Sequence, residues 1–389
     1  LSPSERDGAS GRAPSSVTPS AQSPQERAID RSAVGEIAAM LDGRRPLIVA
    51  GPMAPWQPRR AAIARLARRC GAPLLADPLS GLRCGPHVTE TAVIAAYDAV
   101  CAAGVAPRPP DVVLRFGATP TSAPLQRYLG GLSVPQVMIT ASTIGNDPHR
   151  VTTDQIVGPP GAVAAALCEQ LPPTEPYASA WAEPAAVAAA RLREAPVGGA
   201  GVVIQQVDAA LQADAALVIG SSMPVRELDR YGGVHPRTRV TVGNRGASGI
   251  DGLVSTAVGV ARSQPTTLVL GDVSLIHDLG GLIGIDRVGV DLTVVCLNDD
   301  GGGIFEMLPI AEVDPPYTEY FRTPHGLTFD AAAQQFGLSY ERVPPAEFAS
   351  VFAPPAVGMG GRLVEVPLRA ADTHAERDAA EAAIAASLG

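Results

Sequence analysis

Lysine is absent from the 389-residue sequence, so all 30 basic residues are arginine. Set against 39 acidic residues, they leave a formal net charge of −9 and an isoelectric point near 5.2. Because a protein that binds the nucleic-acid backbone needs a basic face, this balance argues against a nucleic-acid partner. No packing or binding requirement explains a complete absence of lysine, which indicates a biased genome composition.

Cysteine is scarce and is spaced for neither metal nor disulfide chemistry. No two cysteines form a C-x-x-C pair, and their separations fit neither a zinc ribbon nor a disulfide framework. We therefore expect buried free thiols in a reducing cytoplasm. The five cysteines are Cys70, Cys84, Cys101, Cys168 and Cys296.

Long apolar runs are also missing. None reaches the roughly 18–20 residues of a membrane helix, and the nearest candidate, 92–106, is interrupted by Asp98 and Gly104. The beginning of the sequence has no apolar core of a signal peptide. The sequence therefore predicts a cytoplasmic protein without stable membrane insertion.

The first residues differ in composition from the rest. Residues 1–27 contain seven serines, four prolines and two glycines but few aliphatic side chains. Such a segment cannot bury enough apolar surface to order itself. We expect residues 1–29 to be a disordered linker.

From Asp30 onward, short aliphatic runs that end at turn residues alternate with helical stretches. Apolar strands separated by helices are typical of a parallel sheet covered on both faces. Two prolines in LPPTEP stop a helix near residue 173. The predicted fold class is therefore α/β, with two doubly wound, mainly parallel domains: a central Rossmann-like domain over 30–173 and a second domain over 174–389. The segment LIVAGPMAP lacks a G-x-G-x-x-G fingerprint, so the first domain need not bind a nucleotide.

The expected strands are 45–51, 72–78, 111–117, 134–141, 215–222, 239–242, 266–272, 291–299 and 362–368. The expected helices include 59–70, 160–171, 250–262, 274–285, 329–336 and 373–387.

Two carboxylates stand where expected strands of the second half end. Asp272 closes the run TTLVLGD, and Asp299 closes DLTVVCLND, 27 positions later. On adjacent parallel strands both would reach one edge of the sheet, where doubly wound sheets bind ligands. Carboxylates and a loop carbonyl such as that of Gly301 suit Mg²⁺, which also binds phosphate oxygens, and a helix beginning near Ser274 would offer amides to that phosphate. For an isolated pair, a turn residue and a helix cap remain the alternative.

Neighbouring segments add glycine and arginine. Residues 243–252 read GNRGASGIDG, with four glycines that permit close backbone approach to a flat ligand. Arg226 and Arg245 leave strand ends on the same side as the aspartates. Guanidinium groups pair bidentately with carboxylates, which suggests dicarboxylic substrates. For either arginine taken alone, a surface ion pair is the favoured alternative. His277, on the helix after Asp272, is interpreted as structural.

Five segments, in this order and spacing, carry a resemblance: GSSMPVRELD, GNRGASGIDG, GDVSLIHDLGGL, NDDGGGIFEMLP and RTPHGLTFDAAAQQFGL. They resemble the thiamine-diphosphate-dependent 2-succinyl-5-enolpyruvyl-6-hydroxy-3-cyclohexene-1-carboxylate synthases of menaquinone biosynthesis (the MenD family). The spacing of the GD and ND pairs is typical of thiamine-diphosphate enzymes in general, whereas GNRGASGIDG together with NDDGGGIF is far more specific. The likeness is strong over about 215–340 and weaker, though collinear, over 35–170. The second domain would then be the diphosphate-binding domain.

The resemblance implies roles for individual residues. Asp272, Asp299 and the Gly301 carbonyl would bind Mg²⁺ (or Mn²⁺). The implied thiamine-diphosphate-binding residues are Gly246, Ala247, Ile250, Gly271, Asp272 and Ser274. The implied substrate-binding residues are Ser222, Arg226, Arg245, Ile304, Phe305 and Leu308, the last three forming an apolar wall beside the thiazolium.

The implied reaction joins two dianions. The cofactor's ylid would add to 2-oxoglutarate, and CO₂ would leave with the cofactor as electron sink. The resulting succinyl carbanion equivalent would add to isochorismate, giving 2-succinyl-5-enolpyruvyl-6-hydroxy-3-cyclohexene-1-carboxylate. The family's site forms between subunits, so the resemblance also implies a homodimer or a dimer of dimers.

Two features depart from the family pattern. Relatives usually show a basic residue after a T-S-like pair, where this chain reads Ala123-Pro124 after Thr121-Ser122. A substrate carboxylate would lose that cation unless Arg127 or Arg115 replaces it. No glutamate here matches the residue that activates the cofactor, which the family carries in an N-terminal pyrimidine-binding domain. We therefore expect no catalytic residue of this kind in this chain, and expect the chain to be inactive without that domain.

Two alternatives stay open. The protein could be another thiamine-diphosphate carboligase or decarboxylase that acts on a different 2-oxo acid, which the arginines and the GNRGASGIDG loop disfavour. It could also be a non-catalytic fragment that retains the Mg²⁺ and diphosphate site.

Overall fold

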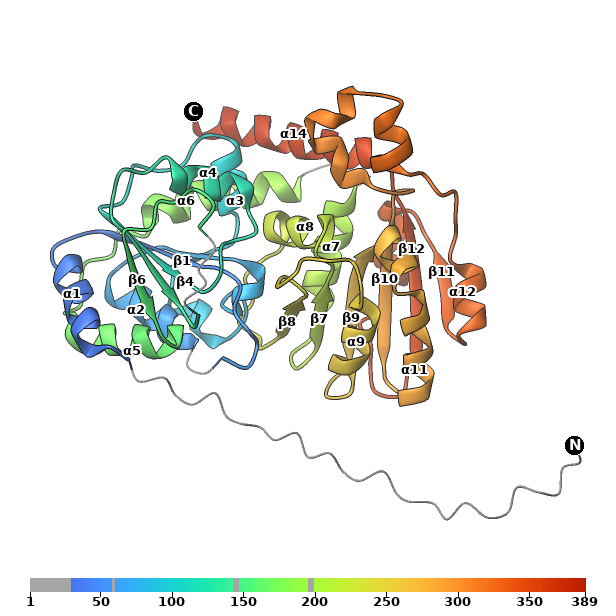
Figure 1. Cartoon of the computed structure of the whole chain (residues 1–389), viewed down its shortest axis with the longest axis horizontal. Coiled ribbons are helices and arrows are strands. Elements are labelled where there is room, and N and C mark those ends of the chain that lie inside the picture. The colour runs from blue at the N-terminus through green and yellow to red at the C-terminus, as the bar shows by residue number, and fades with distance from the viewer. Residues whose placement is uncertain (1–28, 58–59, 143–146, 195–198) are drawn as a thin grey trace, which may run out of the picture.

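The chain is built around two six-stranded sheets, and every pairing in both sheets is parallel. In the computed structural model the two sheets stand side by side with helices around and between them (Figure 1). The structure describes residues 29–389 except 58–59, 143–146 and 195–198. The predicted α/β class with mainly parallel sheets is confirmed. The predicted linker, apart from Ile29, lies outside the described residues.

The first sheet has the order β3-β2-β1-β4-β5-β6, which is the strand order of dinucleotide-binding folds. Its two central strands are buried along their whole length and are apolar except for Arg115 in β4, as expected for parallel sheets covered on both faces. The strands are β1 (Pro46–Ala50), β2 (Leu74–Ala76), β3 (Val93–Ile94), β4 (Val112–Phe116), β5 (Gln136–Thr140) and β6 (Asp154–Val157).

The second sheet has the order β11-β12-β10-β9-β7-β8. The chain runs from β7 to the edge strand β8 and then returns to β9 on the other side of β7. Between β7 and β9 the strand order therefore reverses, and ligands bind at the carboxyl ends of strands at such a point. The strands are β7 (Ala216–Ile219), β8 (Val240–Gly243), β9 (Thr266–Gly271), β10 (Leu292–Asn298), β11 (Ser339–Arg342) and β12 (Gly361–Pro367).

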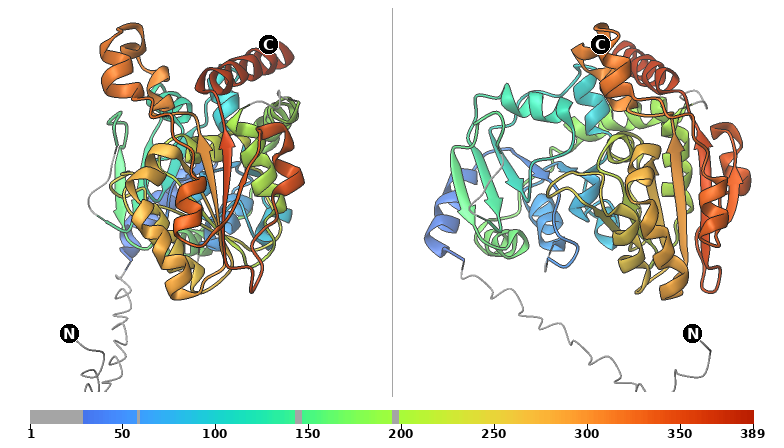
Figure 2. Two further views of the ribbon diagram at one scale, coloured as in Figure 1. Left: turned by 90° about the vertical axis from the view of Figure 1, so that its right-hand side faces the viewer. Right: turned by 45° about the vertical axis from the view of Figure 1, so that its right-hand side comes forward.

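Helices cover the outer faces and fill the space between the sheets (Figures 1 and 2). The outer face of the first sheet packs on α1 (Arg31–Leu41), α2 (Ala61–Arg69) and α5 (Pro160–Gln170). The outer face of the second sheet packs on α9 (Leu253–Ala261), α11 (Ile283–Val288) and α12 (Asp330–Gln335). The helices between the sheets are α3 (Tyr97–Ala102), α4 (Ala123–Gly130), α6 (Ser179–Arg193), α7 (Ala200–Ala210), α8 (Met223–Tyr231), α13 (Phe348–Val351) and α14 (Ala370–Leu388).

One hydrophobic cluster joins the two halves. It runs from the inner face of the first sheet, with Leu47 and Val113, through Trp181 of α6 to Val269 and Val364 of the second sheet. Helix α14 crosses the top of the molecule and contacts both α6 and α3 (Figure 1). This continuous core does not mark where one domain ends and the next begins. The domain boundary at residue 173 therefore stays a prediction. No helix in the described part of the chain is long and apolar enough to cross a membrane.

Two local expectations were wrong. The helix expected over 274–285 is broken into α10 (Asp272–His277), a 3₁₀ turn (Leu279–Leu282) and α11. The break falls at Asp278, whose carboxylate accepts the Ser255 amide hydrogen at 2.9 Å instead of remaining on a helix surface. The strands β3, β6 and β11 were not expected, and all three lie at sheet edges. β3 is only two residues long within the apolar segment 92–97, whereas β6 and β11 are partly exposed and lack apolar runs.

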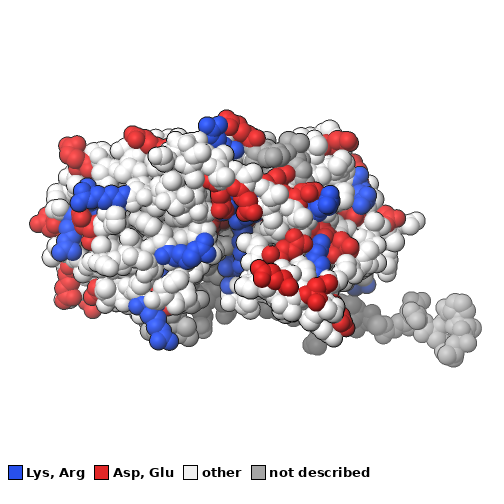
Figure 3. Space-filling view, turned by 90° about the horizontal axis from the view of Figure 1, so that it is seen from above, with Lys and Arg blue, Asp and Glu red and all other residues white. Residues whose placement is uncertain are grey.

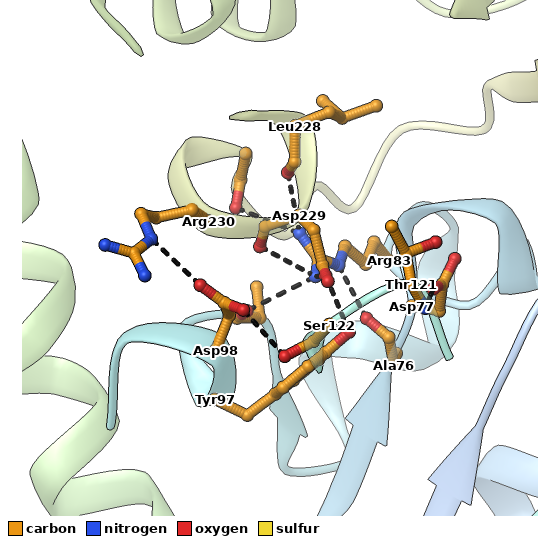
Figure 4. A network of polar contacts seen from close by, with 12 residues as sticks. Ala76, Asp77, Arg83, Tyr97, Asp98, Thr121, Ser122, Leu228, Asp229 and Arg230 are labelled. Carbon is orange, nitrogen blue, oxygen red and sulfur yellow. Dashed lines mark hydrogen bonds and ion pairs between the residues drawn. The ribbon is translucent and has the colours of Figure 1, made fainter. Parts of the chain in front are cut away.

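A buried polar network links the first half to α8 (Figure 4). Arg83 follows β2, and its guanidinium donates to the carboxylate of Asp229 at 2.5 Å and to the carbonyl of Leu228 at 3.1 Å. Tyr97 donates its hydroxyl hydrogen to the same Asp229 oxygen at 2.6 Å, and Arg230 donates to Asp98 at 2.8 Å. Burial, helped by neighbouring acidic groups, raises the pKa of Asp229 although Arg83 acts in the opposite direction.

The network matters because α8 has its other end at the carboxyl edge of the second sheet. Ser222 precedes its first residue, and Arg226 lies on its first turn. From α14, Arg377 donates to Glu227 at 2.8 Å, and both side chains are at least nine-tenths buried. Contacts from the first half and from α14 therefore fix the orientation of α8.

We predict that Arg83→Met lowers the free energy of unfolding by about 3–5 kcal/mol, because it leaves the Asp229 carboxylate buried without its cation. The control is Arg68→Met, which removes an ion pair to Glu90 whose side chains are 48% and 65% exposed; such pairs contribute about 0–1 kcal/mol. Urea denaturation measures both values. Equal losses in the two variants would show that the Arg83 network does not stabilise the junction.

Candidate functional site

A cavity of about 270 Å³ opens at the carboxyl edge of the second sheet, where β7, β9 and β10 end. It therefore lies beside the point at which the strand order reverses. The sequence-predicted residues that line it are Ser222, Ile250, Gly271, Asp272, Ser274, Asp299, Gly301, Ile304 and Phe305. The sheet topology thus brings together nine positions that span 84 residues of sequence.

Asp272 and Asp299 reach this cavity from adjacent strands. β9 and β10 are paired in parallel register with Gly271 opposite Leu297, so the two carboxylates follow neighbouring strand ends. Asp272 is buried, and its Oδ2 accepts hydrogen bonds from the Gly301 amide at 2.8 Å and from His325 Nε2 at 3.0 Å. Its Oδ1 accepts from the amide of Val273 at 2.7 Å.

In the loop after β10, neighbouring atoms lie so close to the backbone that glycine is required at Gly301 and Gly303. Gly301 has φ +123°, which a residue with a side chain rarely adopts, and a Cβ there would overlap the carbonyl oxygen of Arg322. A Cβ on Gly303 would overlap Asp299 Oδ2. The loop therefore lies directly beneath the Asp299 carboxylate, and only glycine leaves room for it.

Asp272 and Asp299 place two acidic side chains close together in the cavity. Burial, followed by the charge of Asp272, raises the pKa of Asp299 to about 7. The nearest cation is Arg322, whose Nη1 is 4.0 Å from Asp299 Oδ1 and whose Nη2 donates to the Asp299 carbonyl. Arg322 also faces Glu306, with Nε 3.4 Å from Oε1, so its charge is shared.

This donor set fits a hard divalent cation. Two carboxylates meet in one cavity, and the Gly301 carbonyl accepts one bond, from Gly303, which leaves its second lone pair available. Among the described residues, no group of three or more His, Cys, Asp or Glu side chains is arranged to hold a metal ion. A cation here would therefore need oxygen ligands from the backbone and from a bound ligand, as Mg²⁺ sites with phosphates have.

Arg226 and Arg245 converge on one carbonyl. Arg226 donates to Ser221 at 3.2 Å and to Ser222 at 2.8 Å, and Arg245 donates to Ser221 at 3.1 Å. Neither forms an ion pair with any residue that the structure describes. Burial, followed by the nearby charge of Arg245, lowers the pKa of Arg226. Two guanidinium groups without carboxylate partners, beside Ser222 of the cavity, are suited to an anionic ligand.

Five predicted residues lie outside the cavity lining: Arg226 and Arg245, described above, and Leu308, Gly246 and Ala247. Leu308 is 48% exposed beyond the end of the 3₁₀ segment Gly303–Met307. Gly246 and Ala247 are exposed in the loop after β8, where Gly246 lines a separate hollow together with Arg245. His277 is half exposed, and its Nδ1 lies 3.6 Å from Asp251.

The two arginines considered as substitutes near Ala123-Pro124 differ in their surroundings. Arg115 is buried in β4 and is paired with Asp147 at 3.1 Å, which engages its charge. Arg127 lies on α4 beside a recess of about 330 Å³ and forms no ion pair with any described residue. The recess adjoins the cavity, since His374 lines both.

Over the face that α14 crosses, acidic and basic side chains are interspersed (Figure 3).

Sequence reasoning missed several residues of the site. The cavity is closed by Tyr320 and Phe321 from the segment after β10, and by Thr373 and His374 from α14. His325 reaches Asp272 across 53 positions of sequence. The only signal for His325 was its place in the quoted segment RTPHGL, and no signal in α14 pointed to His374.

Comparisons with known proteins find several relatives that carry the same name. The chain is 39% identical over 353 residues to 2-succinyl-5-enolpyruvyl-6-hydroxy-3-cyclohexene-1-carboxylate synthase of Halobacterium salinarum, covering 88% of this chain and 59% of that protein. It is 40% identical over 363 residues to the enzyme of the same name from Haloarcula marismortui, covering 90% and 61%. The corresponding protein of Roseiflexus castenholzii is 38% identical over 345 residues, covering 85% and 58%. The chain thus spans about three fifths of the length of these relatives.

A solved structure shares the fold. An X-ray structure of a Mycobacterium smegmatis protein, described as a thiamin diphosphate-dependent enzyme, superimposes with a TM-score of 0.59 at 18% identity. The match covers 88% of this chain and 65% of that one. No family model matches the sequence.

We predict that Gly303→Ala weakens Mg²⁺ binding in the presence of thiamine diphosphate by at least about tenfold, because the new Cβ displaces Asp299. Isothermal titration calorimetry measures the affinity. Gly280→Ala is the matched control, since a Cβ there meets no atom within 4 Å. If both variants bind Mg²⁺ like the parent chain, Asp299 does not contribute to a metal site.

Proposed function

This chain belongs to the family of 2-succinyl-5-enolpyruvyl-6-hydroxy-3-cyclohexene-1-carboxylate synthases, and on that premise we propose that the carboxyl edge of its second sheet binds Mg²⁺ and the diphosphate of thiamine diphosphate. The observation that carries the proposal is the meeting of Asp272 and Asp299 over a glycine loop, at the point where the strand order reverses. A buried and a partly buried carboxylate without a third acidic side chain need a cation that brings phosphate oxygens with it.

We assign the ligands as follows. Asp272, Asp299 and the carbonyl of Gly301 bind Mg²⁺, or Mn²⁺ in its place. Gly271 and Ser274 lie beside the diphosphate, because both line the cavity next to Asp272. Ile304 and Phe305 form the apolar wall of the same cavity, which Ile250 also lines.

The proposed reaction is decarboxylation of 2-oxoglutarate and transfer of its succinyl unit to isochorismate. Bound thiamine diphosphate supplies a carbon nucleophile and an electron sink. The chain supplies charge and shape. Arg226 and Arg245, which are not lining residues but donate to the carbonyls of Ser221 and Ser222, bind substrate carboxylates. The apolar wall of the cavity excludes water from the reacting carbon. Since both substrates are dianions, unpaired guanidinium groups are the side chains best suited to hold them.

The site also needs a carboxylate that activates the cofactor. Among the described residues that line the cavity there is no glutamate. We propose that a pyrimidine-binding domain supplies it and that the complete site forms in a homodimer or a dimer of dimers. A cytoplasmic location remains a prediction. All five cysteines are free thiols, but only Cys70 and Cys296 are buried, so the expectation of buried thiols is wrong for the other three.

We predict that Asp272→Ala abolishes Mg²⁺-dependent retention of thiamine diphosphate. The substitution removes a direct ligand, which costs more than the about 10–100-fold typical of residues behind the ligands. Equilibrium dialysis of the chain with thiamine diphosphate, with and without Mg²⁺, measures retention. The control is Asp286→Ala, an exposed carboxylate on α11. Normal retention by Asp272→Ala would refute the metal assignment.

We further predict that Arg226→Ala and Arg245→Ala lower kcat/KM for 2-oxoglutarate or isochorismate but spare cofactor affinity. Loss of a desolvated charge contact costs about 2–5 kcal/mol. The assay combines the chain with a separately produced pyrimidine-binding domain of a relative, and turnover should require that domain. Arg262→Ala, an exposed arginine after α9, is the control. Unchanged kinetics for both substrates in both variants would assign these arginines a structural role.

A further inference from the structure

We infer that His325 is a positioning residue that fixes the carboxylate of Asp272 in the orientation in which it binds the cation; the inference rests on the proposed function. His325 lies in the loop between the helical turn Thr318–Arg322 and α12, 53 positions after Asp272 in sequence. Its imidazole is 14% exposed, and Nε2 lies 3.0 Å from Asp272 Oδ2. No other side chain among the described residues donates a hydrogen bond to Asp272.

The hydrogen bonds of the ring assign its tautomer. The amide of Leu327 donates to His325 Nδ1 at 3.0 Å. Nδ1 must therefore be the unprotonated nitrogen, and Nε2 carries the hydrogen that it donates to Asp272. The neutral ring is thus held as a donor by its own loop and needs no added proton.

The loop is in turn fastened to the loop that carries Asp299. Asp300 Oδ1 accepts the amide hydrogens of His325 at 2.9 Å and of Gly326 at 2.7 Å. Asn298, the last residue of β10, donates to the carbonyl of Leu327 at 3.0 Å. His325 therefore spans the two strand ends: its backbone is bound beside Asp299, and its side chain is bound to Asp272.

This arrangement divides the two oxygens of Asp272. Oδ2 accepts from His325 and from the Gly301 amide, while Oδ1 accepts only from the adjacent Val273 amide among the described residues. Without the imidazole, Oδ2 keeps a single donor and the carboxylate can rotate about its χ2 angle. Groups that orient a metal ligand in this way typically contribute about 10–100-fold to metal affinity.

Two substitutions separate the bond to Asp272 from the bond within the loop. In His325→Gln the terminal amide nitrogen can occupy the place of Nε2 and still donate to Asp272. In His325→Asn the shorter side chain reaches only the place of Nδ1, where it can accept from Leu327 but cannot reach Asp272. Mn²⁺ is the probe, titrated into the 389-residue chain with thiamine diphosphate and followed by the electron paramagnetic resonance signal of free Mn²⁺. His277→Asn, at a histidine that does not touch Asp272, is the control.

We expect His325→Asn to weaken Mn²⁺ binding about 10–100-fold, with His325→Gln within about threefold of the parent chain and His277→Asn unchanged. Thermal unfolding midpoints should change equally in the two His325 variants. Equal Mn²⁺ affinities of His325→Asn and His325→Gln would overturn the inference and leave the proposed function intact. Failure of the parent chain to bind Mn²⁺ with thiamine diphosphate would instead overturn the proposed function, and the inference with it.

Discussion

Two like charges, Asp272 and Asp299, share one cavity at the ends of adjacent strands, and much of the surrounding structure holds them there. The parallel register of β9 and β10 sets their spacing, and the glycine loop provides the space that the Asp299 carboxylate occupies. Bringing two carboxylates together in a buried site is unfavourable unless a cation or a proton accompanies them. Burial and the charge of Asp272 raise the pKa of Asp299 for this reason. A divalent cation would offset the repulsion between the two carboxylates.

The cavity also depends on contacts far from it. Helix α8, which begins directly after Ser222 and carries Arg226, ends in the network of Arg83 and Asp229. The side chains of that network come from both halves, and one hydrophobic cluster continues through the same junction. A first half without a nucleotide fingerprint therefore has a physical role in this chain, since it sets the position of a helix whose other end borders the cavity.

The sequence predicted the central strands and the residues directly after them, because buried parallel strands are apolar on both faces and the polar residues at their ends stand out. Asp272, Asp299 and the glycine loop were predictable for that reason. Edge strands such as β6 and β11 were not, because their exposed faces carry polar residues and no apolar run marks them.

Contacts between segments far apart in the chain also could not be predicted from the sequence. His325 binds Asp272 only because two loops meet in space, and Arg115 could not be distinguished from Arg127 before Asp147 was seen to engage it. Leu308 and Gly246 carry the right motif positions, yet in this structure both lie outside the cavity lining. A motif assigns residue types to a site, whereas the fold decides which of them line it.

The most direct test of this account is a crystal structure of the chain grown with thiamine diphosphate and Mg²⁺. The account predicts density for a metal ion in contact with Asp272, Asp299 and the Gly301 carbonyl, with the diphosphate beside Gly271 and Ser274. Diphosphate bound at the carboxyl ends of β1 and β4 in the first sheet, or a cavity at β9 and β10 that excludes the metal ion, would contradict it.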